Sequence, residues 1–461
     1  MAASGDQQTA VSGPGPGAPD PAPDGTAPAD SAPDSTVPAA GRRPWWVWAV
    51  PFAALFAMLC VRNRFLFTTR LYEQGDGGAN SILIAQAKHF TLLVGNYSRE
   101  GFNHPGPAYL YVQAIGEYLF QDLLHVVPTA WNAHMLSVFA LDSAFVALAV
   151  GVVYGWTRSV RGAAACFAVF IAFAVAYPPI VNSDWMPYMY VPAYVVFLLA
   201  AASVVAGRGQ DAWVFALSGW FLIHGQACFL LFVPVITVAV LAAVLWPARR
   251  TLRASAGAFF RERRRVWLPV AVISAVFALP IVVNLVLHWP GDFGKYLSYG
   301  KSGKAGGHGL RQVVRYALHF WWPHPDAWLV LVGGYAVALA VTWWLSRGPL
   351  RRFCLVLLAV NLVSSLTFLL YAAVGIDDLT EYYIGYFYWS APLVVALVVV
   401  LVLAEAMREK AGTVLAAAAA LAAFVALTVV PGSRTSTKDI DEALPQVVAT
   451  LAARAPGQMI V

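Results

Sequence analysis

Apolar runs of about 20 residues recur along this chain, and they constrain its fold more than any other feature. Of the 461 residues, 59% are hydrophobic and only 12% are charged. A run of that length crosses the hydrocarbon core of a bilayer as a helix, which satisfies its own backbone hydrogen bonds. The sequence therefore predicts an all-α, polytopic membrane protein.

The apolar runs predict about eleven transmembrane helices. They cover residues 45–62, 132–156, 163–182, 188–206, 211–224, 226–246, 266–288, 327–346, 352–373, 386–404 and 411–430. With this count, the arginine-rich stretches between runs all fall on one side, which the positive-inside rule assigns to the cytoplasm. These stretches also account for most of the net charge of +6, so the charge does not indicate nucleic-acid binding. We expect a cytoplasmic N-terminus and an external C-terminus.

The spans divide the chain into four parts. They are a disordered cytoplasmic tail at 1–43, a transmembrane core at 44–326 with long outer loops at 63–131 and 289–326, C-terminal transmembrane helices at 327–430, and an external tail at 431–461. The first tail is rich in Ala, Pro, Gly and Asp and lacks the apolar side chains that ordering requires.

Residues 107–126 form an apolar stretch interrupted by Gln, Glu and Asp. This amphipathic pattern is typical of an interfacial helix in the first outer loop. The alternative, a twelfth span, would place Arg158 and Arg161 outside the cytoplasm, against the positive-inside rule.

Asp76 lies between glycines shortly after the first span. Glycine lets the backbone approach a ligand closely, and a carboxylate at the membrane surface is a candidate functional group. The alternative is a solvated loop residue.

The order of spans and long outer loops, with Asp76 early in the first loop, resembles the GT-C superfamily of integral-membrane glycosyltransferases, which includes aminoarabinose transferases and protein mannosyltransferases. His104 and Pro105 look like the His/Lys-Pro element of that family, and Asp184 resembles the acidic residue that often follows the third span. The resemblance implies that Asp76 is the catalytic base or a metal ligand and that sugar comes from a polyprenyl-linked donor.

Three points about this candidate catalytic set stay open. Asp184 would bind a divalent metal ion together with Asp76, orient the acceptor sugar, or cap the next helix. His104 would contact the donor or the acceptor, or be structural. A single aspartate at position 76, where familiar members have an acidic pair, leaves metal dependence unknown.

The second outer loop is rich in cations and glycines. Its candidate donor-phosphate ligands are Lys295, Lys301, Lys304, His308, Arg311 and Arg315. Positive charge outside the membrane runs against the topological bias, and backbone N–H groups of glycines also bind phosphate. The alternative is a flexible, solvated loop.

A third, short outer loop carries Asp377, Asp378 and Glu381 beside several tyrosines. Carboxylates accept hydrogen bonds from sugar hydroxyls and rings stack on sugar faces, so this loop is a candidate acceptor site. An ordinary interfacial aromatic belt is the alternative.

The resemblance, taken with these candidate sites, implies a glycosyltransferase that moves a sugar from a polyprenyl-phosphate donor to a glycan or lipid acceptor of the cell envelope. The predicted topology places its site on the outer face of the membrane. The ratio of 24 arginines to six lysines suggests a GC-rich bacterial genome, so the membrane would be a bacterial cytoplasmic membrane. The alternative is a non-enzymatic transporter or polysaccharide-export component.

Overall fold

The computed structural model describes residues 43–73, 75–302, 306–429 and 444–454. The tail predicted at 1–43, apart from Arg43, lies outside these ranges, as do Lys304 and most of the tail at 431–461. Within the described ranges every regular element is a helix, and one isolated antiparallel bridge pairs Tyr97 with Asn103.

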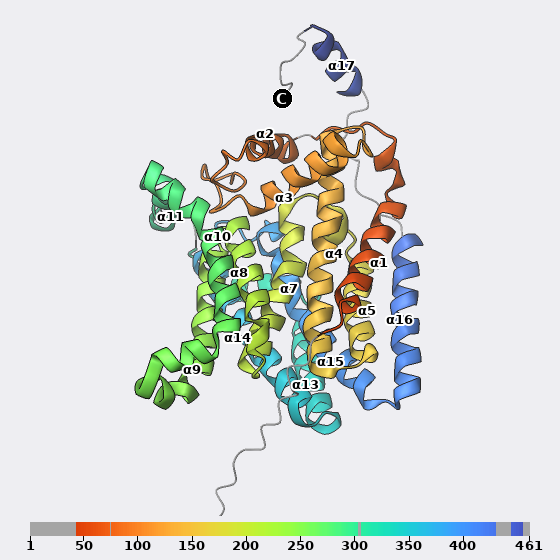
Figure 1. Cartoon of the computed structure of the whole chain (residues 1–461), viewed down its shortest axis with the longest axis vertical. Helices are drawn as coiled ribbons and strands as arrows, with labels where there is room; N and C mark the ends of the chain where they lie inside the picture. Colours follow the sequence, from red (N-terminus) through yellow and green to blue (C-terminus); the bar gives the residue numbers. More distant parts are fainter. Residues whose placement is uncertain (1–42, 74, 303–305, 430–443, 455–461) are drawn as a thin grey trace, which may run out of the picture. The chain divides into compact units, whose positions relative to one another are not determined.

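The helices and short helical segments follow one another along the chain (Figure 1). They are α1 (Trp46–Arg62), η1 (Arg64–Phe67), α2 (Asp76–Lys88), α3 (Ala108–Gly116), η2 (Glu117–Leu123), α4 (Ala130–Thr157), α5 (Val160–Ala176), α6 (Pro179–Asn182), α7 (Met186–Val205), η3 (Gly209–Asp211), α8 (Ala212–Gly225), α9 (Phe229–Glu262), α10 (Arg264–His288), α11 (Gly291–Lys301), α12 (Leu310–His319), α13 (Ala327–Leu345), α14 (Gly348–Val374), η4 (Tyr382–Trp389), α15 (Ser390–Ala406), α16 (Glu409–Val429) and α17 (Leu444–Arg454).

Eight helical stretches of the described residues are long and apolar enough to cross a membrane. They lie in α4, α7, α9, α10, α13, α14, η4 with α15, and α16. The shorter helices α1 and α5 are also apolar. The class of helical membrane protein is thus confirmed, whereas the total of about eleven spans remains a prediction.

The segment 107–126 forms α3 and the π-helical η2, and neither is among the eight stretches. Its two acidic side chains form ion pairs within the protein. Lys88 at the end of α2 contacts Glu117 (2.6 Å) and Asp122 (2.7 Å), and His134 of α4 contacts Glu117 (2.9 Å). This network ties α2 to η2 and α4. That η2 and α3 lie at the membrane interface stays a prediction.

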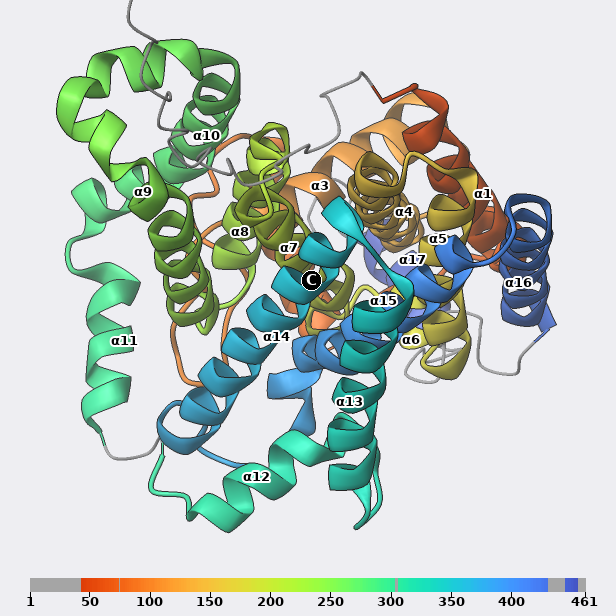
Figure 2. The same cartoon turned by 90° about the horizontal axis from the view of Figure 1, so that it is seen from below.

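Helix α7 forms the centre of the bundle and packs against α4, α8, α9, α14 and α15 (Figure 2). Its side chains from Tyr190 to Ser203 are buried almost without exception. By contrast, α10 and α13 expose large apolar side chains such as Val276, Leu279 and Trp344, as lipid-facing helices do.

The turn that leads into α7 positions the side chains of Asp184 and Trp185. The chain leaves α6 at Asn182, and Pro187 follows in the first turn of α7, where its missing N–H costs no hydrogen bond. Asp184 and Trp185 therefore lie in a short non-helical turn.

Candidate functional site

A cavity of about 600 Å³ opens among the segments that connect the helices at one end of the bundle. Its wall comes from the loop 96–104, the entry into α7, the turn between α8 and α9, helix α11, the end of α14 and the segment 375–384. Eight aromatic rings line it: Tyr97, Phe102, Trp185, Tyr190, Tyr296, Tyr299, Tyr371 and Tyr383. Its acidic and basic side chains are Asp76, Arg99, Glu100, His104 and Asp377. The cavity thus combines stacking surfaces with hydrogen-bonding groups, as ligand sites do.

Asp76 lies on this wall as the first residue of α2. The preceding Gly75 has φ +56°, which favours glycine and turns the chain into the helix. The Tyr97 hydroxyl donates to Oδ1 of Asp76 at 2.6 Å, and the Trp185 indole donates to Oδ2 at 3.3 Å. The bond to Asp76 raises the pKa of Tyr97. The carboxylate is therefore exposed to the cavity but held by two donors.

His104 lies on the same wall. The Ala227 backbone N–H donates to Nδ1 of its ring at 3.2 Å, so the proton of the neutral ring is assigned to Nε2. Burial lowers the pKa of His104 to about 4, although the Asp292 carboxylate acts in the opposite direction. At neutral pH His104 is consequently uncharged.

Asp184 lies behind the wall and does not line the cavity. The Trp131 indole donates to its Oδ2 at 2.9 Å, and the Tyr109 hydroxyl donates to its backbone carbonyl at 2.6 Å. Burial raises the pKa of the Asp184 carboxyl. Its neighbour Trp185, by contrast, lines the cavity and donates to Asp76.

Asp76 and Asp184, the two predicted metal ligands, are not part of a larger group of metal-binding side chains in the described chain. Both oxygens of Asp76 and one oxygen of Asp184 already accept from neutral donors. Among the residues that the structure describes, no group of three or more His, Cys, Asp or Glu side chains is placed to hold a metal ion. These residues therefore do not fit a divalent ion such as Mg²⁺ or Ca²⁺, which takes roughly six or more oxygen ligands.

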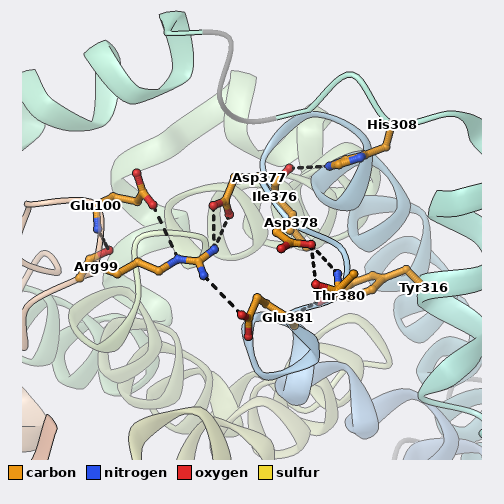
Figure 3. Close-up of polar contacts among 10 residues, drawn as sticks. Arg99, Glu100, His308, Tyr316, Ile376, Asp377, Asp378, Thr380 and Glu381 are labelled. Carbon is orange, nitrogen blue, oxygen red and sulfur yellow. Dashed lines mark hydrogen bonds and ion pairs between the residues drawn. The ribbon is translucent and has the colours of Figure 1, made fainter. Parts of the chain in front are cut away.

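Sequence reasoning missed Arg99, the most connected charge on the wall (Figure 3). Its Nη2 donates to both oxygens of Asp377, at 2.8 and 2.7 Å. Glu100 and Glu381 lie 3.6 and 3.9 Å from other nitrogens of the guanidinium, which also lies 5.9 Å from the Tyr383 ring centre. The position of Arg99 in a predicted outer loop was an available signal, because positive charge there opposes the positive-inside bias.

The predicted acceptor residues divide between wall and surroundings. Asp377 lines the cavity, whereas Asp378 is exposed outside it. The backbone N–H and the hydroxyl of Thr380 donate to Asp378 at 2.8 and 2.7 Å and lower its pKa. Glu381 lies beside Arg99 but not on the wall.

The predicted phosphate ligands that the structure describes lie outside the cavity lining, and their role in phosphate binding stays a prediction. Lys295 pairs with Asp292 of its own helix (2.9 Å), and His308 Nε2 lies 2.9 Å from the Ile376 carbonyl. Lys301 is exposed at the end of α11. Of the described cations of this loop, none lines the cavity; α11 supplies Tyr296, Tyr299 and Gly300 instead.

Arg311 and Arg315 are exposed on α12, a separate helix. Its buried side is formed by Val313, Tyr316 and Ala317. These two arginines thus face away from the packed side of α12, and Lys304 lies outside the described residues.

Asp142 is a second group that sequence reasoning missed. It is fully buried within α4, and in the described part of the chain neither carboxyl oxygen has a hydrogen-bond partner. The adjacent Ser143 hydroxyl is also buried without one. The signal was a lone carboxylate inside an apolar run, which usually marks function in a membrane protein.

The fold and its apolar helices define a helical membrane protein. Comparison of the chain with protein-family models, with curated proteins and with solved structures gave no match. The resemblance to GT-C glycosyltransferases therefore remains a hypothesis.

Proposed function

We propose that this protein is a membrane glycosyltransferase that moves a sugar from a polyprenyl-phosphate donor to a cell-envelope acceptor. The observation that carries the proposal is the cavity itself, because it brings Asp76 and His104 onto one wall with eight aromatic rings. Rings that stack on sugar faces and carboxylates that accept from hydroxyls suit a carbohydrate site.

In this proposal Asp76 is the general base. An acceptor hydroxyl attacks the anomeric carbon of the donor sugar, the bond from that carbon to the phosphate oxygen breaks, and polyprenyl phosphate leaves. The hydroxyl proton passes to Asp76. Tyr97 and Trp185 hold the carboxylate in place, and direct displacement inverts the anomeric centre.

The lipid chain and the phosphate of the donor would contact different parts of the wall. Apolar wall residues such as Met186, Leu231 and Val374 suit the first carbons of a lipid chain. The phosphate is expected at the α11 rim, where Gly300 lines the wall and the exposed Lys301 follows it.

Replacement of Asp76 tests the proposal. Asp76→Asn keeps the shape and removes the proton acceptor, so transfer of labelled sugar from polyprenyl phosphate should fall by roughly 10²–10⁴. Asp326→Asn is the matched control, since Asp326 is an exposed carboxylate that is not part of the cavity wall. A well-expressed Asp76→Asn protein with full transfer activity would refute the assigned base.

Asp142 favours a second candidate, a proton-coupled transporter. Buried carboxyl groups within membrane helices are typical of proton pathways. Proteoliposomes that enclose a pH-sensitive dye test this alternative. A proton flux carried by the wild type and abolished by Asp142→Asn would support the transporter, and equal flux in both proteins would argue against it.

A further inference from the structure

The charges on the cavity wall are unbalanced. Among the described lining residues, Asp76, Glu100 and Asp377 are carboxylates, and Arg99 is the single guanidinium. His104 is neutral at pH 7 because burial lowers its pKa to about 4. With three negative groups and one positive group, the wall carries a net charge of −2.

Arg99 is not available to an incoming anion without a further cost. Its Nη2 donates to both oxygens of Asp377, and hydrogen bonds between ionised groups are roughly twice as strong as those between neutral groups. A ligand carboxylate that took the place of Asp377 would leave that carboxylate unpaired beside Glu100 and Glu381.

The carboxylates of the wall suit a ligand that donates hydrogen bonds. Carboxylates accept and do not donate, so Asp76 and Glu100 match the hydroxyls of an uncharged sugar. The rings of Trp185 and Tyr383, 5.2 Å apart at their centres, provide an apolar surface beside Asp76. Neither feature compensates a negative charge on the ligand.

We infer that the cavity selects uncharged sugar rings and rejects sugars that carry a carboxylate, with Glu100 and Asp377 as the specificity-determining residues. The inference rests on the proposed function in taking the ligand to be a sugar. It adds that discrimination comes from repulsion by the wall and not from the loss of a favourable contact.

Saturation-transfer NMR on the full-length protein in detergent micelles tests the inference. The probes are the methyl glycosides of glucose, galactose and mannose, each paired with its uronate at equal concentration and pH 7. We expect at least one neutral glycoside to bind. Its uronate should bind at least roughly tenfold more weakly, because repulsion between like charges a few ångströms apart changes affinity by about this factor.

The double variant Glu100→Gln/Asp377→Asn neutralises both residues and brings the net wall charge from −2 to zero. It should bind the uronate within about threefold of the neutral glycoside, because the repulsion is gone. Asp326→Asn removes one exposed carboxylate elsewhere and should keep the wild-type preference. Retained binding of the neutral glycoside shows that the double variant is folded.

Three results would overturn the inference: no neutral glycoside binds the wild type, a uronate binds it as well as its neutral partner, or the double variant binds the neutral glycoside and still rejects the uronate. Failure of the proposed function looks different. The charge preference would then be present while no sugar transfer from polyprenyl phosphate is detected.

Discussion

Protonation of His104 at mildly acidic pH should destabilise the folded protein. The neutral ring accepts a hydrogen bond from the Ala227 N–H through Nδ1, and a protonated ring has no acceptor to offer. Burial lowers the pKa of His104 to about 4, whereas in an unfolded chain it is about 6.5. Between these two values the unfolded state binds a proton that the folded state does not.

The sign and size of the effect follow from that difference. Stability is unaffected above pH 6.5, decreases as the pH falls from 6.5 to 4, and is constant with respect to this group below 4. Lowering the pH from 7 to 5 should cost about 2 kcal/mol of unfolding free energy through His104. This figure is an upper bound, because the side chain is partly exposed in the cavity.

Unfolding by SDS in mixed micelles, at pH 7 and at pH 5, measures this effect. His104→Asn is the matched variant, because its side-chain oxygen can accept from Ala227 and does not titrate. The loss of stability between the two pH values should be smaller in the variant by up to about 2 kcal/mol. Equal losses in both proteins would mean that His104 titrates near its usual pKa, and the reasoning from burial would be refuted.

Three further predictions concern the wall and the topology. Tyr97→Phe removes the hydroxyl that holds Asp76 and should lower transfer roughly tenfold, as a hydrogen bond to a charged group implies; an unchanged rate in the membrane assay would contradict this. Lys301→Ala should raise the donor KM several-fold with kcat little changed, since it removes charge beside Gly300 at the rim; the opposite split would place the phosphate elsewhere. A cysteine at the exposed Val160 should stay protected from an impermeant thiol reagent in intact cells, and its labelling would refute the predicted topology.

The sequence was sufficient for the class of protein and for part of the wall. Helix length and composition identify a membrane bundle without any tertiary information. Asp76 and His104 belong to one predicted outer loop, and Asp377 to another at the same predicted face. Such residues share a surface once the alternation of spans is known, although the roles proposed for them remain predictions.

Pairings over long distances were beyond the sequence. Arg99 and Asp377 are separated by 278 positions, and no pattern in either loop specifies the other as a partner. The density of charge in the second outer loop did not specify how its cations are arranged, because residues that are close in sequence can lie on different helices. Lys301 ends one helix, whereas Arg311 and Arg315 occupy the exposed side of the next.

The separation of charges bears on how a donor would be bound in the proposed reaction. Carboxylates line the cavity, while Lys301, Arg311 and Arg315 lie exposed on α11 and α12 outside its lining. A phosphate inside the cavity would meet a net negative wall, but at the α11 rim it would meet the opposite sign. The sugar would thus enter the cavity with its phosphate held at the α11 rim. The negative charge that grows on the phosphate as the bond breaks would be destabilised by the carboxylates of the wall, so its stabilisation would have to come from the cationic α11 rim, where Lys301 lies.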